Sequence, residues 1–284
     1  MASAEKSDRL FQGVLIIGTC LLIAATAMAQ GQGNPQGPPA SKGLVQSGYA
    51  IITPTSSATA GLVVFETFGE QHGNDTTQAG VLPSSMTTHA MIFVSTNGRL
   101  SRNIGVAIAN PGATDANVAL TLRDDTGATL ATIPPIKVTA RTQITRFVTE
   151  LFSTQPSVPQ DLTGTMDIAS DSPVAVMGVR FRGINFSTMP ATNLSAPLPV
   201  PVVATGIGGP NAVILPQFAT GGGWATEIIL ANTGASALTV RVDLFGQDGL
   251  PLVATLNGQS SSSFIDIMIP AGGVVVLDSG GNGF

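Results

Sequence analysis

The chain contains one strand–turn–strand pattern twice. Residues 103–122, NIGVAIANPGATDANVALTL, recur as residues 225–244, ATEIILANTGASALTVRVDL. At a shift of 122 positions, residues 109–130 align with 231–252 without a gap, and eight of these 22 positions are identical. Apolar residues alternate in phase in both copies, as they do in strands with one buried face. This repeat predicts two copies of one β-module.

A second repeat links the N-terminal region to the middle of the chain. Residues 48–65, GYAIITPTSSATAGLVVF, align with residues 164–181, GTMDIASDSPVAVMGVRF, at a shift of 116. Gly48 falls on Gly164, Ile52 on Ile168 and Phe65 on Phe181, and Val63 likewise falls on Val179. Both segments therefore predict the same strand–turn–strand unit.

The order of the four blocks predicts one intact module and one split module. We expect residues 80–195 to form the intact sandwich, 45–79 the closing strands of the split one, and 212–284 its opening strands. Gly/Pro-rich residues 30–44 and 196–211 are expected to be linkers. The split module could be closed by the chain's own N-terminal segment or by that of a second molecule. We expect closure within one chain, because the tether raises the effective concentration of the two halves. Residues 48–65 would then pair with strands of 225–278 and bury Ile52, Val63 and Phe65.

The composition favours an all-β fold, namely two immunoglobulin-like β-sandwiches after a signal helix. Hydrophobic residues make up 43% of the chain and charged residues only 10%, with 33 Gly and 19 Pro. Such a chain can bury a core, and it favours strands and tight turns over solvated helices. RDDTGATL and FGQDGLPL are predicted hairpin turns, and only residues 146–152 are expected to form a short helical turn. The net charge of −5 disfavours nucleic-acid binding.

The first 29 residues predict export. Lys6 and Arg9 precede an unbroken apolar run that ends in Ala27-Met28-Ala29, the pattern of a signal-peptidase site. The alternative is an uncleaved membrane anchor, because the run is nearly long enough to span a bilayer. Lipidation of Cys20, the only cysteine, is disfavoured by the preceding Thr19. We therefore expect a secreted or cell-surface bacterial protein, with the periplasm as another location, and a mature chain without disulfides.

Several segments also resemble a known kind of protein. GVAIANPGATDANVALTLRDDTGATL, TELF, GVRF and LPQFATGGGWATEIILANTG are similar to the immunoglobulin-like repeat modules of large exported proteins from acidobacteria and other soil bacteria. The resemblance covers about residues 45–284 and implies an architecture and a location, but no catalytic residue. In such proteins a GYA-type segment usually follows strands such as PAGGVVVLD. Here GYA stands at 48–50, which splits the second module in sequence order.

The residues that could carry chemistry are few. His72 and His89, the only histidines, have no second ligand at metal spacing, so we interpret both as surface residues. Asp124 and Asp125 could bind calcium, but they stand where a hairpin turn needs Asp. The segment DSGGNG at 278–283 has too few acids for a calcium loop. We therefore predict no catalytic, metal or cofactor site and no enzymatic activity.

Two arginines are the candidate binding surface. Arg180 and Arg182 alternate with Val179 and Phe181 and so are expected to share the outward face of a strand, where they could bind an acidic polymer. Trp224 and Tyr49, the only tryptophan and tyrosine, are too few for a sugar-stacking platform, and Trp224 is expected in the core. The expected function is structural or adhesive, with itself or other exported proteins as partners. The alternative is a glycan- or protein-binding module. Contact with a membrane is expected only if the signal segment is uncleaved.

Overall fold

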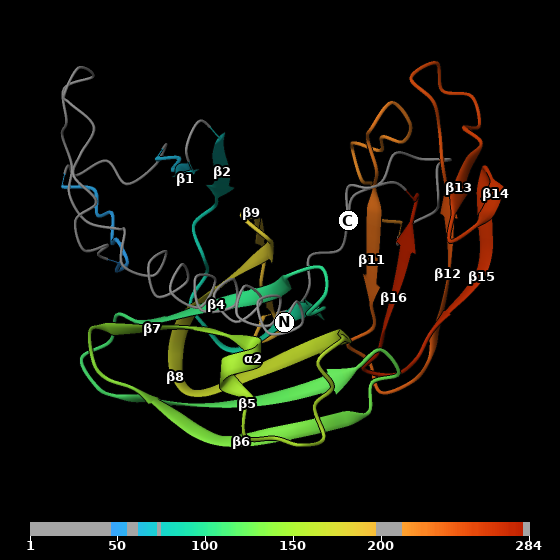
Figure 1. Cartoon of the computed structure of the whole chain (residues 1–284). Helices are drawn as coiled ribbons and strands as arrows, with labels where there is room; N and C mark the ends of the chain where they lie inside the picture. The colour runs from blue at the N-terminus through green and yellow to red at the C-terminus, as the bar shows by residue number, and fades with distance from the viewer. Residues whose placement is uncertain (1–46, 56–61, 73–74, 197–211, 281–284) are drawn as a thin grey trace, which may run out of the picture.

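The fold of this chain is built almost entirely of strands (Figure 1). A computed structural model describes residues 47–55, 62–72, 75–196 and 212–280. The predicted signal segment 1–29, the linker 30–44 and nearly all of the linker 196–211 lie outside these residues. Within them, no helix is long and apolar enough to cross a membrane. The predicted all-β sandwich fold is confirmed.

A complete sandwich occupies residues 87–193. Its strands are β3 (Thr87–Thr96), β4 (Arg102–Asn110), β5 (Ala116–Asp124), β6 (Thr129–Val138), β7 (Thr142–Phe147), β8 (Leu162–Arg182), β9 (Asn185–Met189) and β10 (Thr192–Asn193). The short helix α2 (Val148–Leu151) follows β7 at the predicted place.

The long strand β8 belongs to both sheets of the complete sandwich. Its first half pairs with β3 on one side and β5 on the other, and β6 and β10 extend that sheet. Its second half pairs with β4 and β9, and β7 extends this sheet beyond β4. Apolar residues from β3, β4, β5 and β8 meet between the sheets, and the largest fully buried ones include Ile92, Ile104, Leu120 and Ile168. Strand β8 thus contributes apolar side chains to the core from both sheets.

A hairpin covers the outer face of the second sheet. Strands β1 (Glu66–His72) and β2 (Asp75–Val81) pair with each other, and Phe68 of β1 stacks on Phe186 of β9 at a centroid distance of 5.1 Å. Phe181 of β8 contacts Phe147 edge-on at 5.4 Å in the same cluster. Both faces of the second half of β8 are therefore packed.

The C-terminal strands repeat four strands of the complete sandwich. They are β11 (Glu227–Ala231), β12 (Leu238–Asp243), β13 (Ala254–Leu256), β14 (Gln259–Ser261), β15 (Ser263–Ile269) and β16 (Val274–Asp278). β11 pairs with β16 as β4 pairs with β7, and β12 pairs with β15 as β5 pairs with β6. The repeat predicted from sequence is thus a repeat of strand pairing. We call residues 227–278 the open half.

A buried asparagine holds the same turn in both copies. Nδ2 of Asn110 donates to the carbonyl oxygens of Thr114 at 2.8 Å and Val138 at 2.9 Å. Nδ2 of Asn232 donates to those of Ser236 at 2.8 Å and Pro270 at 3.0 Å. In each copy the Oδ1 atom accepts the N–H of the glycine two residues on. The shared asparagine in the sequence therefore marks a shared hydrogen-bonding unit.

The expected closure of the split module is not found, so that prediction is wrong for the described residues. Within them, β11 pairs only with β16, β12 pairs only with β15, and residues 47–55 and 62–65 form no strand. Ile52 is 58% exposed, Val63 70% and Phe65 77%. Among the residues that the structure describes, the open half therefore has no counterpart of β8, and its buried cluster is much smaller than that of the complete sandwich.

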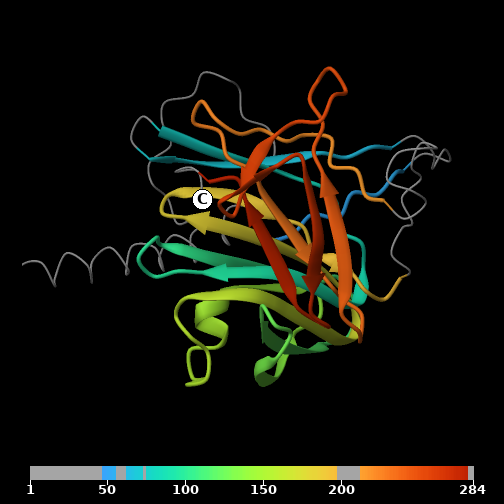
Figure 2. The same cartoon turned by 90° about the vertical axis from the view of Figure 1, so that its right-hand side faces the viewer.

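The open half stands against one end of the complete sandwich (Figures 1 and 2). The N–H of Val274 donates to the carbonyl of Asp125 at 2.9 Å, so the β15–β16 turn contacts the β5–β6 turn. Arg180 of β8 forms an ion pair with Glu227 of β11. Hydrogen bonds and charge, together with close backbone contact, thus join the two units.

Candidate functional site

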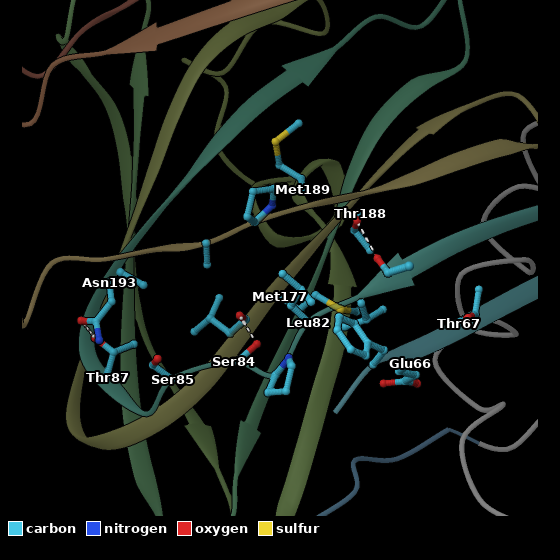
Figure 3. Close-up of a pocket in the computed structure, with 18 residues that line it drawn as sticks. Glu66, Thr67, Leu82, Ser84, Ser85, Thr87, Met177, Thr188, Met189 and Asn193 are labelled. Atoms are coloured by element: carbon cyan, nitrogen blue, oxygen red, sulfur yellow. Dashed lines mark hydrogen bonds between the residues drawn. The ribbon is translucent and has the colours of Figure 1, made fainter. Parts of the chain in front are cut away.

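A groove of about 690 Å³ lies between the β1–β2 hairpin and the complete sandwich (Figure 3). Its walls come from residues 65–67, from the connection between β2 and β3, and from β8 and β9. Leu82, Met177 and Met189 give it an apolar surface, and hydroxyl side chains stand among them. Grooves of this kind can hold a small molecule.

Three hydroxyl groups of the groove already have structural partners. Ser84 Oγ donates to the carbonyl of Val176 at 3.1 Å, and Thr188 Oγ1 donates to that of Gly80 at 2.9 Å. Thr87 Oγ1 donates to Asn193 Oδ1 at 2.8 Å. Among the described lining residues, Glu66 is the one titratable group. Its described lining residues therefore offer no pair of titratable side chains for acid–base catalysis.

The expected outward position of Arg180 is wrong. Arg180 lies on the same face of β8 as Val174 and Val176, which point into the core. Only 13% of its side chain is exposed, and Glu227, its partner in the ion pair, is 8% exposed. Because the open half packs over this end of the sheet, Arg180 is part of a contact between the two units. Sequence periodicity could not show that the open half covers Arg180.

Arg182 and Arg102 lie at the same end of the sheet, where Arg102 pairs in register with Arg182. Burial lowers the pKa of Arg102, and the nearby charge of Arg180 lowers it further. Nη1 of Arg102 donates to Ser95 Oγ at 3.2 Å. The charges of Glu227 and Asp278 act in the opposite direction on the pKa of Arg102, and that of Glu227 has the larger effect.

The predicted turn role of Asp124 is confirmed by its contacts. Oδ1 of Asp124 accepts the N–H of Thr126 at 3.0 Å and that of Ala128 at 2.9 Å. The backbone of Asp125 bonds to Val274. In the part of the chain that the structure describes, no three His, Cys, Asp or Glu residues are grouped to hold a metal ion. The His89 side chain is 46% exposed and lies 3.7 Å from Asp167.

Trp224 corrects another expectation, since it is 72% exposed and not in the core. It closes a tight turn with Gly221 through two backbone hydrogen bonds. Exposed large apolar residues are frequent in two places, and both were read from sequence as parts of a strand or core. They are Ile51, Ile52, Leu62, Val63 and Phe65 near the N-terminus, and Val213, Ile214, Leu215 and Trp224 before the open half.

The unpaired strand edges of the open half are the second candidate site. β12 corresponds to β5 in the repeat, yet Val240 and Val242 are only half-buried where Val118 and Leu120 are fully buried. The difference arises because β8 covers β5 and nothing in the described chain covers β12 in the same way. An unpaired edge with apolar side chains is a ready site for strand addition.

Comparisons with known proteins leave the family open. No family model matches the chain, and no curated protein does. Among solved structures, the Anabaena sensory rhodopsin transducer is similar at 23% identity and a TM-score of 0.29, covering 34% of this chain and 98% of its own. A structure titled "Crystal Structure of Thermotoga maritima 1070" is similar at 12% identity and a TM-score of 0.28, covering 37% of this chain and 90% of its own. Similarity at this level carries no argument about function.

Proposed function

We propose that this protein is an exported, non-catalytic structural or adhesive protein of the bacterial cell surface or extracellular space. It acts by associating with itself or with other exported proteins. The observation that carries the proposal is the open half, whose strands β11 and β12 each have one partner among the described residues. A strand edge of this kind binds by main-chain hydrogen bonds and needs no catalytic group.

The side-chain chemistry supports a non-catalytic role. Three hydroxyl groups of the groove, those of Ser84, Thr87 and Thr188, donate to backbone or amide oxygens of the fold itself. Asp124 caps a turn, and Arg180 joins the two units. Asp124, Arg180 and these hydroxyl groups thus serve structural contacts, which favours an adhesive function over a hydrolytic one.

A glycan- or protein-binding module is the second candidate, and the groove favours it. Its apolar floor with hydroxyl groups at the walls could hold a sugar or a short peptide. A glycan array distinguishes the candidates. Adhesion by strand edges predicts no preference among sugars, whereas selective retention by one sugar class would favour the groove.

Adhesion is tested in the producing bacterium. Cells that lack the gene should aggregate less, or adhere less to surfaces, than cells that carry it, and the wild-type gene should restore the effect. Equal aggregation and adhesion of the two strains would contradict the proposed function.

Export is tested by intact mass. Protein from the exporting host should start at Gln30, because the signal-peptidase pattern ends at Ala29. A membrane-bound chain that still contains Met1 would contradict cleavage and favour the anchored alternative.

A further inference from the structure

We propose that residues 48–55 of one copy insert beside β12 of a second copy and take the place that β8 occupies in the complete sandwich. The inference rests on the proposed adhesive function and names its partner, a second copy of this chain. Three observations carry it: an acceptor edge that has no strand beside it among the described residues, a donor segment that repeats the glycine and isoleucine of β8, and a second apolar segment that is also exposed.

The acceptor is defined by comparison with the complete sandwich. There β5 lies between β6 and β8, and Leu120 of β5 is opposite Ile168 of β8, both almost completely buried. In the open half, β12 has β15 on the side where β5 has β6. The side that corresponds to β8 has no strand in the described chain.

The donor is defined by the repeat between residues 48–65 and 164–181. In β8, Gly164 passes so close to β5 that a Cβ atom there would lie 2.0 Å from the carbonyl oxygen of Arg123. Gly48 supplies a glycine at the corresponding place in the donor. Ile52 corresponds to the buried Ile168, but it is 58% exposed here. The donor thus shares with β8 the glycine and the isoleucine at these two places, and its isoleucine is not buried.

The third observation lies before the open half. In the complete sandwich β8 pairs on its other side with β3, where Ala90 is opposite Ile168 and Ile92 opposite Met166. At the shift of 122, the β3 residues Ala90, Met91 and Ile92 correspond to Ala212, Val213 and Ile214. Val213 is 71% exposed and Ile214 59%. An inserted strand would thus be covered on both sides, by residues 212–214 and by β12.

The pairing within the complete sandwich gives the register of the insertion. Because Ile168 is opposite Leu120 and Ala169 opposite Ala119, Ile52 should lie opposite Val242, and Thr53 opposite Arg241. Ile52 would then point into the core of the open half, while Thr53 and Arg241 share the other face.

The geometry favours insertion between molecules over closure within one. In Figure 1 the described N-terminal segment, in blue, lies on the opposite side of the molecule from β12. Donor and acceptor are therefore different surfaces of the same chain. A contact between two different surfaces is head-to-tail, so it produces a ring where the rotation between copies closes and an open-ended filament where it does not.

The register is tested by disulfide formation between two singly substituted chains in a Cys20→Ser background. One chain carries Thr53→Cys and the other, lengthened by a tag, carries Arg241→Cys. Under oxidising conditions we expect a disulfide-linked heterodimer, because residues opposite each other in neighbouring strands are close enough for a disulfide. The control pairs Leu100→Cys, at an exposed turn of the complete sandwich, with Arg241→Cys and should give none.

Sedimentation across concentrations tests the association itself. Ile52→Asp should weaken self-association at least about tenfold, since insertion would bury a carboxylate. Leu100→Asp, a matched change at a 43% exposed leucine, should leave it unchanged. Circular dichroism should be the same for both variants, because both side chains are exposed in the single chain.

Three results would overturn the insertion. They are a chain that stays monomeric at all concentrations, self-association without the Thr53–Arg241 heterodimer, and a doubly substituted chain whose two cysteines link within one monomer. The cell-adhesion assay is independent of all three. If cells without the gene adhere less but the cross-link does not form, the proposed function is retained and the insertion is rejected.

Discussion

At the scale of single residues, the two buried asparagines explain why this repeat kept a polar side chain in a core position. Asn110 is 1% exposed and Asn232 6%. Each side chain binds carbonyl oxygens from two separate segments and one glycine N–H. An apolar residue there would leave buried carbonyl groups without donors, which costs more than the hydrogen bonds themselves contribute.

We expect Asn110→Ala to lower the free energy of unfolding of the complete sandwich by about 2 to 3 kcal/mol, because the carbonyls of Thr114 and Val138 lose their donor. Urea unfolding measures the change. Asn185→Ala, at an exposed position, is the control and should change it by less than about 0.5 kcal/mol. Equal effects of the two variants would contradict the structural role of Asn110.

Acid stability follows from Asp171. Its carboxylate accepts the backbone N–H of Asn117 at 2.9 Å and Nδ2 of the same residue at 2.7 Å, and the backbone bond is the main cause that lowers its pKa below the usual 3.8. Since the pKa is lower in the folded chain, the stabilisation is present above about pH 4 and is lost as the pH falls through the folded pKa.

Between about pH 4 and pH 2, Asp171→Asn and Asn117→Ala should therefore both lose less stability than the wild type does. The urea midpoint as a function of pH measures the slope. If both variants show the same change of urea midpoint with pH as the wild type, the contact between Asp171 and Asn117 does not contribute to the pH dependence of stability. A similar but separate effect is expected from Asp115, whose pKa is lowered mainly by its hydrogen bond to Lys137.

At the scale of elements, the same turn serves two purposes. Gly127 and Gly249 lie in the turns after their strands and have positive φ values of 87° and 78°. Glycine adopts such angles without the strain that another residue would have. A Cβ atom at Gly127 would lie 2.1 Å from the carbonyl oxygen of Ala271, whereas one at Gly249 would meet nothing within 4 Å. The first turn therefore also carries the contact with the open half.

Gly127→Ala should cost more stability than Gly249→Ala, because both variants carry the strain of positive φ, about 1 kcal/mol, but only the first displaces the β15–β16 turn. Thermal unfolding compares the two. Small-angle scattering should show a looser arrangement of the two units for Gly127→Ala alone. Identical melting and scattering of the two variants would contradict a tight contact at this turn.

At the scale of the whole molecule, a buried ion pair joins a complete sandwich to an open half. Glu227 forms the ion pair with Arg180 and its charge also acts on Arg102, so its loss removes a nearly buried acid from beside two cations. We expect Glu227→Gln to lower the free energy of unfolding by about 3 kcal/mol.

Asp243→Asn is the matched control for Glu227→Gln. It breaks the ion pair with Arg241, whose side chain is 61% exposed, and exposed pairs contribute about 1 kcal/mol or less. Chemical unfolding measures both variants. If Asp243→Asn lowers the free energy of unfolding as much as Glu227→Gln does, the ion pair between the units stabilises the chain no more than an exposed pair.

Much of this architecture could be predicted from the sequence, because it depends on neighbours in the chain. Alternating apolar residues predicted β5 and β12, and the paired asparagines and turn glycines marked the same turn twice. These features act over a few residues, through the two-residue period of a strand and the allowed backbone angles of a turn. They required no knowledge of the rest of the molecule.

Only the tertiary structure decided which surfaces are covered. The sequence could not show that the open half packs over Arg180, that Trp224 stays exposed, or that Ile52 and Val63 remain outside the sheets. Burial depends on segments far apart in the chain, and the same apolar alternation suits a strand in any sheet that lacks one. The repeat indicates which strand residues 48–55 resemble, and only the tertiary structure shows that they join no sheet among the described residues.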